Sequence, residues 1–275
     1  MREFASAHSY RDFQFTVKKK ARYFHDEGVR SFLEAVLQTS ESRTDTIKKL
    51  TVLCRAQRGS TWRTEKIGGE EGQEGVEVDG PDAFEPERMK PNADFALDGR
   101  VNPRGIACLY LASDAETAMA EVRPWVGSYV SLGYFRVLRD MKVVDCSKDK
   151  RTSLWVFTEP AELSADKRER VVWGDIGHAL SRPITPDESP TEYVPTQILA
   201  EAFRAHGYDG IVYRSLLGKG HNIALFEPDS ADLVSCGLYE TESISFKFEQ
   251  CSNPYFIKKY LDEPKSKTSD SNQPT

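Results

Sequence analysis

The chain has 275 residues, and 37 Lys and Arg against 43 Asp and Glu give it a formal net charge of −6 at pH 7. This acidic balance argues against a protein that coats nucleic acid, which needs a basic surface. No run approaches the ~18 to 20 apolar residues of a membrane-spanning helix, so we expect neither nucleic acid nor membrane as a partner. With 39% hydrophobic residues, the length suits one large domain, or a domain of roughly 150 to 200 residues with an accessory segment.

The amino terminus lacks the apolar stretch of a secretory signal, which predicts a cytoplasmic protein. The five cysteines are odd in number, widely spaced and mostly set in apolar runs, a pattern typical of reduced core residues. No Cys or His motif has the spacing of a zinc site, so we expect no metal centre.

Residues 1–49 predict a small helical prefix. From about Tyr10 the segment is charged and helix-prone, and Phe32, Leu33 and Val36 are spaced to form one apolar stripe that resumes at Ile47 after a polar break. The main domain is expected over residues 50–261.

Two segments are predicted to stay out of the core. Residues 64–94 form an acidic, glycine-rich stretch with few large apolar side chains, which predicts a mobile loop because little burial offsets the entropy of ordering. The tail, residues 262–275, is equally polar and is predicted to be disordered.

The rest of the main domain alternates between runs typical of strands and of helices, which predicts an α+β fold. A strand is expected at residues 107–112. Ser113 and Glu116 then have the capping-box spacing that starts a helix, and Pro124 ends it. Further strands are expected at residues 128–138, 142–146, 210–213, 222–226 and 243–248, and helices at 171–180 and 195–206, the last stopped by Gly207.

Three polar residues lie at the ends of predicted strands, where clefts are usually built. Arg55 follows one apolar run, Ser215 follows another, and Asn222 opens a third. Each alone is also typical of a solvated strand end, so only their convergence would indicate a site.

The turn Gly99 to Gly105 combines an Asn-Pro step with two guanidinium groups. Such a turn can present backbone N–H groups and the Arg100 side chain to a phosphate, with Asn102 shaping the turn. The alternative is a basic surface turn that leads into the next strand.

Glu121 is the carboxylate most suited to chemistry. It lies near the carboxyl end of its predicted helix, where the helix dipole favours a cation, whereas Glu116 has a capping role. A residue that breaks a local rule is a candidate for function.

Two stretches of the sequence resemble a known family. Residues 99–122 (GRVNPRGIACLYLASDAETAMAEV) and residues 193–226, with Tyr213-Arg214-Ser215, are similar to the RES domain, which is named after an Arg, a Glu and a Ser. Matched by motif, these are Arg55 in Leu53-Cys54-Arg55-Ala56, then Glu121 and Ser215. The resemblance covers about residues 50–226.

The resemblance implies an ADP-ribosyltransferase-like fold, with mixed or antiparallel sheets flanked by helices, that acts on NAD as a substrate and needs no cofactor. Glu121 would stabilise an oxocarbenium-like state, and Arg55 would hold the diphosphate. The other implied contacts with NAD come from Tyr110, stacking on the nicotinamide, and from Arg100, Asn102, Ser215 and Asn222.

The resemblance leaves the acceptor open. The enzyme would be an NAD glycohydrolase or phosphorylase of the toxin type; the alternative is ADP-ribosyl transfer to a protein acceptor, and a third interpretation is a non-catalytic NAD-sensing or protein-binding module. RES toxins are neutralised by an antitoxin or immunity protein. The helical prefix departs from the compact family pattern and could serve targeting, regulation or a homodimer.

Overall fold

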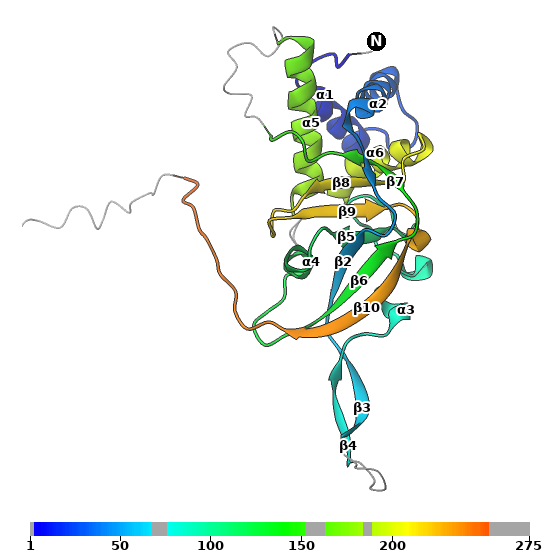
Figure 1. Ribbon diagram of the computed structural model, residues 1–275. Coiled ribbons are helices and arrows are strands. Elements are labelled where there is room, and N and C mark those ends of the chain that lie inside the picture. Colours follow the sequence, from blue (N-terminus) through cyan, green and yellow to red (C-terminus); the bar gives the residue numbers. More distant parts are fainter. Residues whose placement is uncertain (1–2, 68–75, 152–162, 184–188, 253–275) are drawn as a thin grey trace, which may run out of the picture. The chain divides into compact units, whose positions relative to one another are not determined.

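The computed structural model describes residues 3–67, 76–151, 163–183 and 189–252. The chain divides into two units, Met1–Glu242 and Ser243–Thr275. The first contains all the described helices and strands (Figure 1), and the second has no helix or strand among its described residues. The first unit has the α+β fold that the sequence predicts.

An eight-stranded sheet forms the centre of this unit, in the order β1-β7-β8-β9-β5-β2-β6-β10. Neighbouring strands are antiparallel except β7 and β8, which are parallel. The strands are β1 (Thr44–Ile47), β2 (Val52–Arg58), β5 (Leu109–Ala112), β6 (Tyr129–Val137), β7 (Met141–Asp145), β8 (Gly210–Arg214), β9 (His221–Leu225) and β10 (Ala231–Glu240).

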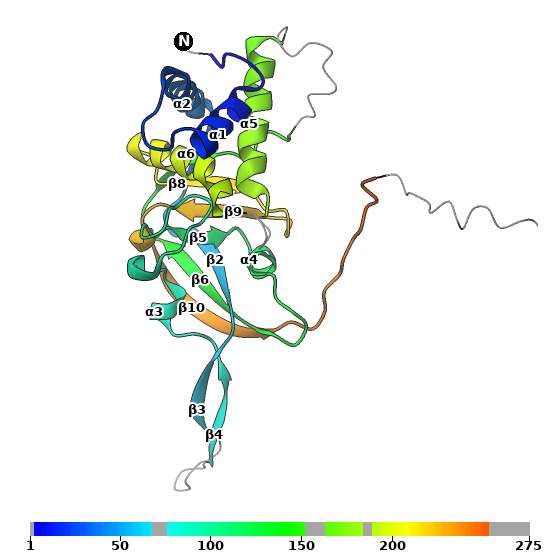
Figure 2. The same ribbon diagram turned by 180° about the vertical axis from the view of Figure 1, so that it is seen from behind.

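Four helices lie together beside β7, β8 and β9, as Figures 1 and 2 show from opposite sides. They are α1 (Ser9–Lys19), α2 (Glu27–Ser40), α5 (Ala165–Ser181) and α6 (Val194–Ala205). Phe32, Trp173 and Phe203 bring three of them into one core with Ile211 of β8. The predicted N-terminal helices therefore pack into the same core as the sheet.

Both faces of the sheet bury apolar side chains, because successive residues of a strand point to opposite sides. In β9, Ala224 joins the core beneath the helices, while Ile223 and Leu225 join a second core on the other face. Met89 of the short helix α3 (Pro86–Met89) is fully buried in that second core.

The prediction of a mobile loop at residues 64–94 is wrong for most of the residues there that the structure describes. A hairpin forms from β3 (Thr61–Ile67) and β4 (Val76–Asp82), which Figure 1 shows extending from the main sheet, and α3 and a 3-10 turn, Ala93–Phe95, follow it. Backbone pairing orders the hairpin without much apolar burial, and the α3 segment is anchored by Met89. Residues 68–75 of that prediction lie outside the described part of the chain, as does the predicted tail.

The predicted strand at residues 243–248 does not form. Its apolar alternation is regular, but β10 occupies the edge of β6 in a long antiparallel ladder that runs from Ala231 opposite Val137 to Glu240 opposite Tyr129. Likewise Ile47 belongs to β1 and not to a resumed helix. The predicted helices at residues 171–180 and 195–206 are confirmed by α5 and α6, and Gly207 has the positive φ of a left-handed cap, +83°.

Candidate active site

A pocket of about 490 Å³ lies where β2, β5 and β9 meet the short helix α4 (Ala115–Glu121). It brings together most of the predicted site residues. Its lining consists of Cys54, Arg55, Ala56, Arg100, Tyr110, Leu111, Ala112, Ala118, Glu121, Val122, Arg123, Tyr193, Tyr213 and Asn222.

The pocket is built at a weak point of the sheet. The ladder between β2 and β5 consists of one residue pair, Cys54 opposite Ala112. Next to this pair, Nη1 of Arg55 donates a 3.0 Å hydrogen bond to the backbone oxygen of Tyr110. A side chain of β2 thus supplies the donor that a backbone N–H group supplies in a regular ladder. Arg55 is thus in the middle of β2, and the prediction that it marks a strand end is wrong.

Arg55 is a buried cation in the lining of the pocket. Burial lowers the pKa of its guanidinium, which remains protonated because an arginine starts so far above neutral pH. Its Nε atom is buried and has no hydrogen-bond partner among the described residues. A buried cation with an unpartnered N–H group suits an anionic ligand.

Glu121 is the last residue of α4, and two side chains hold its carboxylate. Ser215 Oγ donates to Glu121 Oε1 at 2.6 Å, and Asn222 Nδ2 donates to the same oxygen at 2.7 Å. Ser215 directly follows β8, as predicted, and Asn222 is the second residue of β9, which begins one position before the predicted start. Both bonds end on Oε1 and neither uses Oε2.

The Ser215 hydroxyl is fully engaged. Its oxygen accepts hydrogen bonds from the backbone N–H groups of Leu217 (3.1 Å) and Gly218 (2.8 Å), while its proton points to Glu121. This geometry orients the carboxylate and differs from the direct contact with NAD that the resemblance implies for Ser215.

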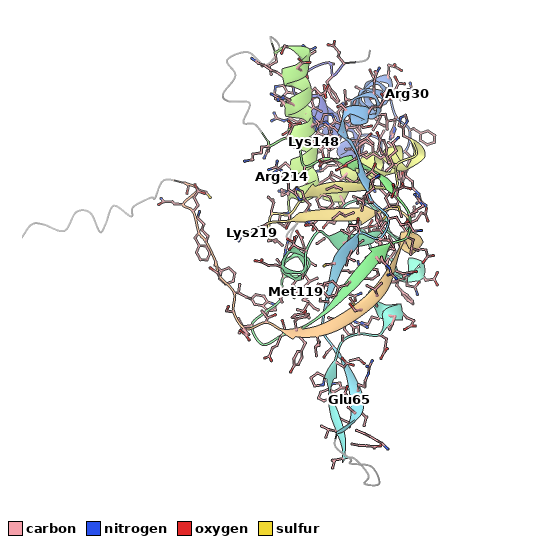
Figure 3. The ribbon with its side chains drawn as sticks, viewed as in Figure 1. Arg30, Glu65, Met119, Lys148, Arg214 and Lys219 are labelled. Atoms are coloured by element: carbon pink, nitrogen blue, oxygen red, sulfur yellow. The ribbon has the colours of Figure 1, made fainter. Side chains whose placement is uncertain are left out.

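A second set of bonds fixes α4 against the loop between β8 and β9. Asp114, not Ser113 as predicted, is the N-cap and accepts from Thr117 N at 2.8 Å. Thr117 Oγ1 donates to Asp114 Oδ2 and accepts from Gly220 N at 3.0 Å. Figure 3 shows Met119 on α4 and Lys219 in this loop. The node of Asp114, Thr117 and Gly220 therefore joins the segment that carries Glu121 to the segment that carries Ser215.

Tyr110 is held in place by the turn before β5. Its hydroxyl donates to Asn102 Oδ1 at 2.6 Å and accepts from Val101 N at 3.1 Å, and burial raises its pKa well above the ordinary value. The Asn102 amide donates in turn to the backbone oxygens of Leu97 and Ile106. Asn102 is not among the lining residues, so it supports Tyr110 from behind. The absence of a side chain at Gly99 leaves room for the Tyr110 hydroxyl, since a Cβ at Gly99 would lie 2.4 Å from it.

Arg100 lines the pocket, but its guanidinium also serves the fold. Its Nη1 donates to the backbone oxygens of Leu180, at 2.9 Å, and of Arg182, at the carboxyl end of α5. The Arg100 backbone oxygen accepts from Thr196 Oγ1 of α6 at 2.5 Å. Arg100 is therefore a link between the pocket wall and two helices.

Two tyrosines in the pocket were not assigned from the sequence. Tyr193 immediately precedes α6, and Tyr213 is a buried residue of β8 whose pKa is raised by burial. Both lie in the stretch that carries the resemblance, and Tyr213 stands two residues before Ser215. Their closeness to Ser215 and to the matched motifs was the sequence signal that could have identified them as pocket residues.

The described residues contain no group of three or more His, Cys, Asp or Glu side chains that could hold a metal ion. Within the same residues, no helix combines the length and the apolar character needed to cross a membrane.

No curated protein matches the chain. Among solved structures, the chain is similar to the M. tuberculosis MbcT-MbcA toxin-antitoxin complex at 15% identity and a TM-score of 0.37, over 75% of this chain and 92% of that chain. The family model of the RES domain matches residues 77–248, which include Glu121, Ser215 and Asn222, while Arg55 precedes the matched range. Since the match spans more than half of the chain, this protein belongs to the RES domain family.

Proposed function

We propose that this protein cleaves NAD at the bond between nicotinamide and ribose, as a glycohydrolase or phosphorylase of the toxin type. The observation that carries the proposal is the Glu121 carboxylate, held by Ser215 and Asn222 in a pocket that also contains the Arg55 guanidinium. Membership of the RES domain family supports the choice of NAD as the substrate.

One carboxylate suffices for this reaction. Nicotinamide leaves NAD as a neutral base from a cationic pyridinium, so the leaving group needs little protonation, unlike that of an ordinary glycoside. Glu121 would face the positive charge that develops on the ribose and bond its hydroxyls through Oε2, because Oε1 is taken by Ser215 and Asn222. These two residues position the carboxylate before the substrate arrives.

The remaining lining residues fit the other parts of NAD. Arg55 would bond the diphosphate through its guanidinium, since the residue lines the pocket. Tyr110, fixed by Asn102, would place its ring against the cationic nicotinamide, a contact worth about 0.5 to 2 kcal/mol. Arg100 would hold the pocket wall in place through its hydrogen bonds to the carboxyl end of α5.

The experiment is to incubate purified protein with NAD, with and without phosphate, and to follow products by mass spectrometry. Nicotinamide release with free ADP-ribose would identify a glycohydrolase, and release with a phosphorylated ADP-ribose a phosphorylase. A mass shift on an added protein acceptor would identify the ADP-ribosyltransferase alternative.

The matched variants are Glu121→Gln and, on the same helix, the exposed Glu116→Gln. We expect Glu121→Gln to lose about 100-fold or more in turnover with little change in NAD affinity, and Glu116→Gln to behave as wild type. Equal turnover in all three proteins would refute the proposed role. NAD binding without nicotinamide release by wild type would favour a sensing module.

The proposal extends to the cell. An NAD-depleting enzyme would arrest growth in the cytoplasm, where an antitoxin or immunity protein would hold it inactive. Expression of wild type should then stop growth and that of Glu121→Gln should not; arrest by both would contradict NAD cleavage as the cause.

A further inference from the structure

One wall of the active-site pocket is a row of residues that crosses four neighbouring strands. Tyr213 of β8 is directly opposite Asn222 of β9, and Asn222 is directly opposite Ala112 of β5. Ala112 is in turn opposite Cys54 of β2. Residues opposite each other in a sheet share a face, and all four line the pocket. Tyr213 is the largest side chain of this row and lies at one end of it.

The Tyr213 hydroxyl is available to a ligand. The residue is only 3% exposed although it lines the pocket, so the part of it that remains accessible faces the pocket. Its side chain has no hydrogen-bond partner among the described residues. Burial, opposed by Arg100 and assisted by the Glu121 carboxylate, raises the pKa of Tyr213, so the hydroxyl keeps its proton at neutral pH. A buried O–H group of this kind gains a hydrogen bond when a bound molecule offers an acceptor.

Tyr213 stands beside the residues that hold the Glu121 carboxylate. Side chains directly opposite each other on antiparallel strands lie about 4.5 to 5.5 Å apart at Cβ. Asn222, the residue opposite Tyr213, donates to Glu121 Oε1 at 2.7 Å. The proton of Ser215 is committed to the same oxygen. Tyr213 therefore brings an uncommitted proton donor to the part of the pocket where Glu121 is proposed to bind the ribose.

We propose that the Tyr213 hydroxyl donates a hydrogen bond to the 2′-hydroxyl oxygen of the nicotinamide ribose. This inference rests on the proposed function, in which Glu121 Oε2 accepts from the ribose hydroxyls. A ribose hydroxyl that donates to Oε2 keeps lone pairs on its own oxygen, and Tyr213 supplies a donor for them. The 2′-hydroxyl is on the carbon next to C1′, where the bond to nicotinamide breaks, and hydrogen bonds at this position strengthen as the oxocarbenium-like state forms.

The contact would complete a chain of hydrogen bonds from Tyr213 through the ribose 2′-hydroxyl to Glu121. A hydroxyl that accepts one hydrogen bond becomes a better donor in the next, because each bond polarises its neighbour. No proton is transferred along the chain. Tyr213 thereby orients the ribose against the carboxylate that stabilises the reacting carbon.

The test compares wild type, Tyr213→Phe and Tyr129→Phe on NAD and on its analogue with a 2′-deoxyribose in the nicotinamide half. Tyr129 is on β6, is 37% exposed and lies outside the pocket lining, so its variant is the matched control. Nicotinamide release gives kcat and KM. We expect Tyr213→Phe to lower kcat/KM for NAD about fivefold and to equal wild type on the analogue, which lacks the hydroxyl. Tyr129→Phe should equal wild type on both substrates.

Two kinetic results would overturn the inference. An unchanged kcat/KM for NAD in Tyr213→Phe would mean that the hydroxyl does not contact the substrate. An equal loss on NAD and on the analogue would mean that it acts on another part of the molecule or through the fold. The unfolding temperature separates the last case, because removing a hydroxyl without a partner should leave the ligand-free protein at least as stable as wild type.

Equilibrium binding distinguishes the failure of this inference from the failure of the proposed function. If wild type releases no nicotinamide, NAD cleavage is refuted, and calorimetry with intact NAD and the analogue tests the contact directly. We then expect the affinity for NAD to fall about fivefold in Tyr213→Phe and the affinity for the analogue to stay unchanged. Equal affinities of wild type and Tyr213→Phe for NAD would overturn the contact, and no binding of NAD by wild type would overturn both proposals.

Discussion

Ser215 Oγ lies 2.6 Å from Glu121 Oε1, although the two residues are 94 positions apart in the sequence. The bond joins the carboxyl end of α4 to the end of β8, and Asn222 adds a second donor from β9. Glu121 is at the unfavourable end of its helix for a negative charge. The two donors offset that disadvantage and fix the side chain at the pocket wall.

Replacing Asn222 by aspartate should alter the pH dependence of turnover. The new carboxylate would lie about 2.7 Å from that of Glu121, and two carboxylates so close share one proton over a wide pH range. We expect the acid limb of the pH–rate profile to move to higher pH. Asn222→Ala, the matched control, removes a donor to the carboxylate without adding a charge, so it should move the limb by less. A limb that moves no further in Asn222→Asp than in Asn222→Ala would contradict the geometry.

Gly220→Ala should disturb the site from a distance. A Cβ at Gly220 would lie 2.0 Å from Asp114 Oδ2 and 2.3 Å from Ser113 Oγ, so either these side chains or the loop that carries Ser215 must shift, and both moves disturb the contact between this loop and α4. We expect turnover to fall about tenfold or more and stability to fall by about 1 to 3 kcal/mol.

Gly80→Ala is the control for this change, because nothing lies within 4 Å of a Cβ at Gly80. Denaturant unfolding and NAD kinetics of both variants measure the effect. Wild-type kinetics in Gly220→Ala would show that the contact between the loop and α4 does not set the Ser215–Glu121 geometry.

Asp114→Ala should destabilise the protein in a pH-dependent way. Hydrogen bonds from Thr117 N, and then from Ser113 and Thr117 hydroxyls, hold the pKa of Asp114 below its ordinary value. Its stabilising contribution is therefore complete above the unfolded-state pKa of about 3.9, and is lost as the pH falls through the lower folded-state value.

In urea unfolding at pH 7, we expect Asp114→Ala to be less stable than wild type by about 0.5 to 2 kcal/mol, the range for losing an N-cap. The difference should shrink as the pH falls below about 3.9. Glu116→Ala, exposed in the first turn of the same helix, is the control. A difference that is the same at both ends of the pH range would rule out the ionised carboxylate as its source.

Met89→Ala should show that the segment after the hairpin belongs to the core. Met89 is fully buried, so truncation is expected to cost about 2 to 5 kcal/mol of unfolding free energy. Trp62→Ala, on the hairpin and 73% exposed, should change it by no more than about 0.5 kcal/mol. Equal effects of the two substitutions would mean that α3 does not anchor this segment.

The fold could be predicted from the sequence where local pattern decides it. Helical periodicity and a glycine cap locate α5 and α6, and short apolar runs locate β5 through β9. β10 escaped prediction because it is stabilised by pairing with β6, far away in the sequence, and the hairpin because backbone pairing between its own two strands orders it with little apolar burial. The alternation around Phe246 is more regular than that of β10, yet no local feature shows which segment meets the open edge of β6.

The candidate site likewise has a part that the sequence predicts and a part that it does not. The order of Arg55, Glu121 and Ser215 along the chain was sufficient to predict the family, now confirmed by the family match. The bonds that define their roles depend on distances between segments. No local sequence pattern indicates that Arg100 bonds the backbone at the end of α5, or that the Ser215 hydroxyl donates to Glu121.

Arg55 belongs to the sheet and to the pocket at once, because its guanidinium bonds the Tyr110 carbonyl where β2 and β5 part. An anion that draws on the same guanidinium competes with that carbonyl, so ligand affinity and the local stability of the sheet are thermodynamically linked. A lineage that replaced this arginine would have to supply both a new anion contact and a new donor between the two strands.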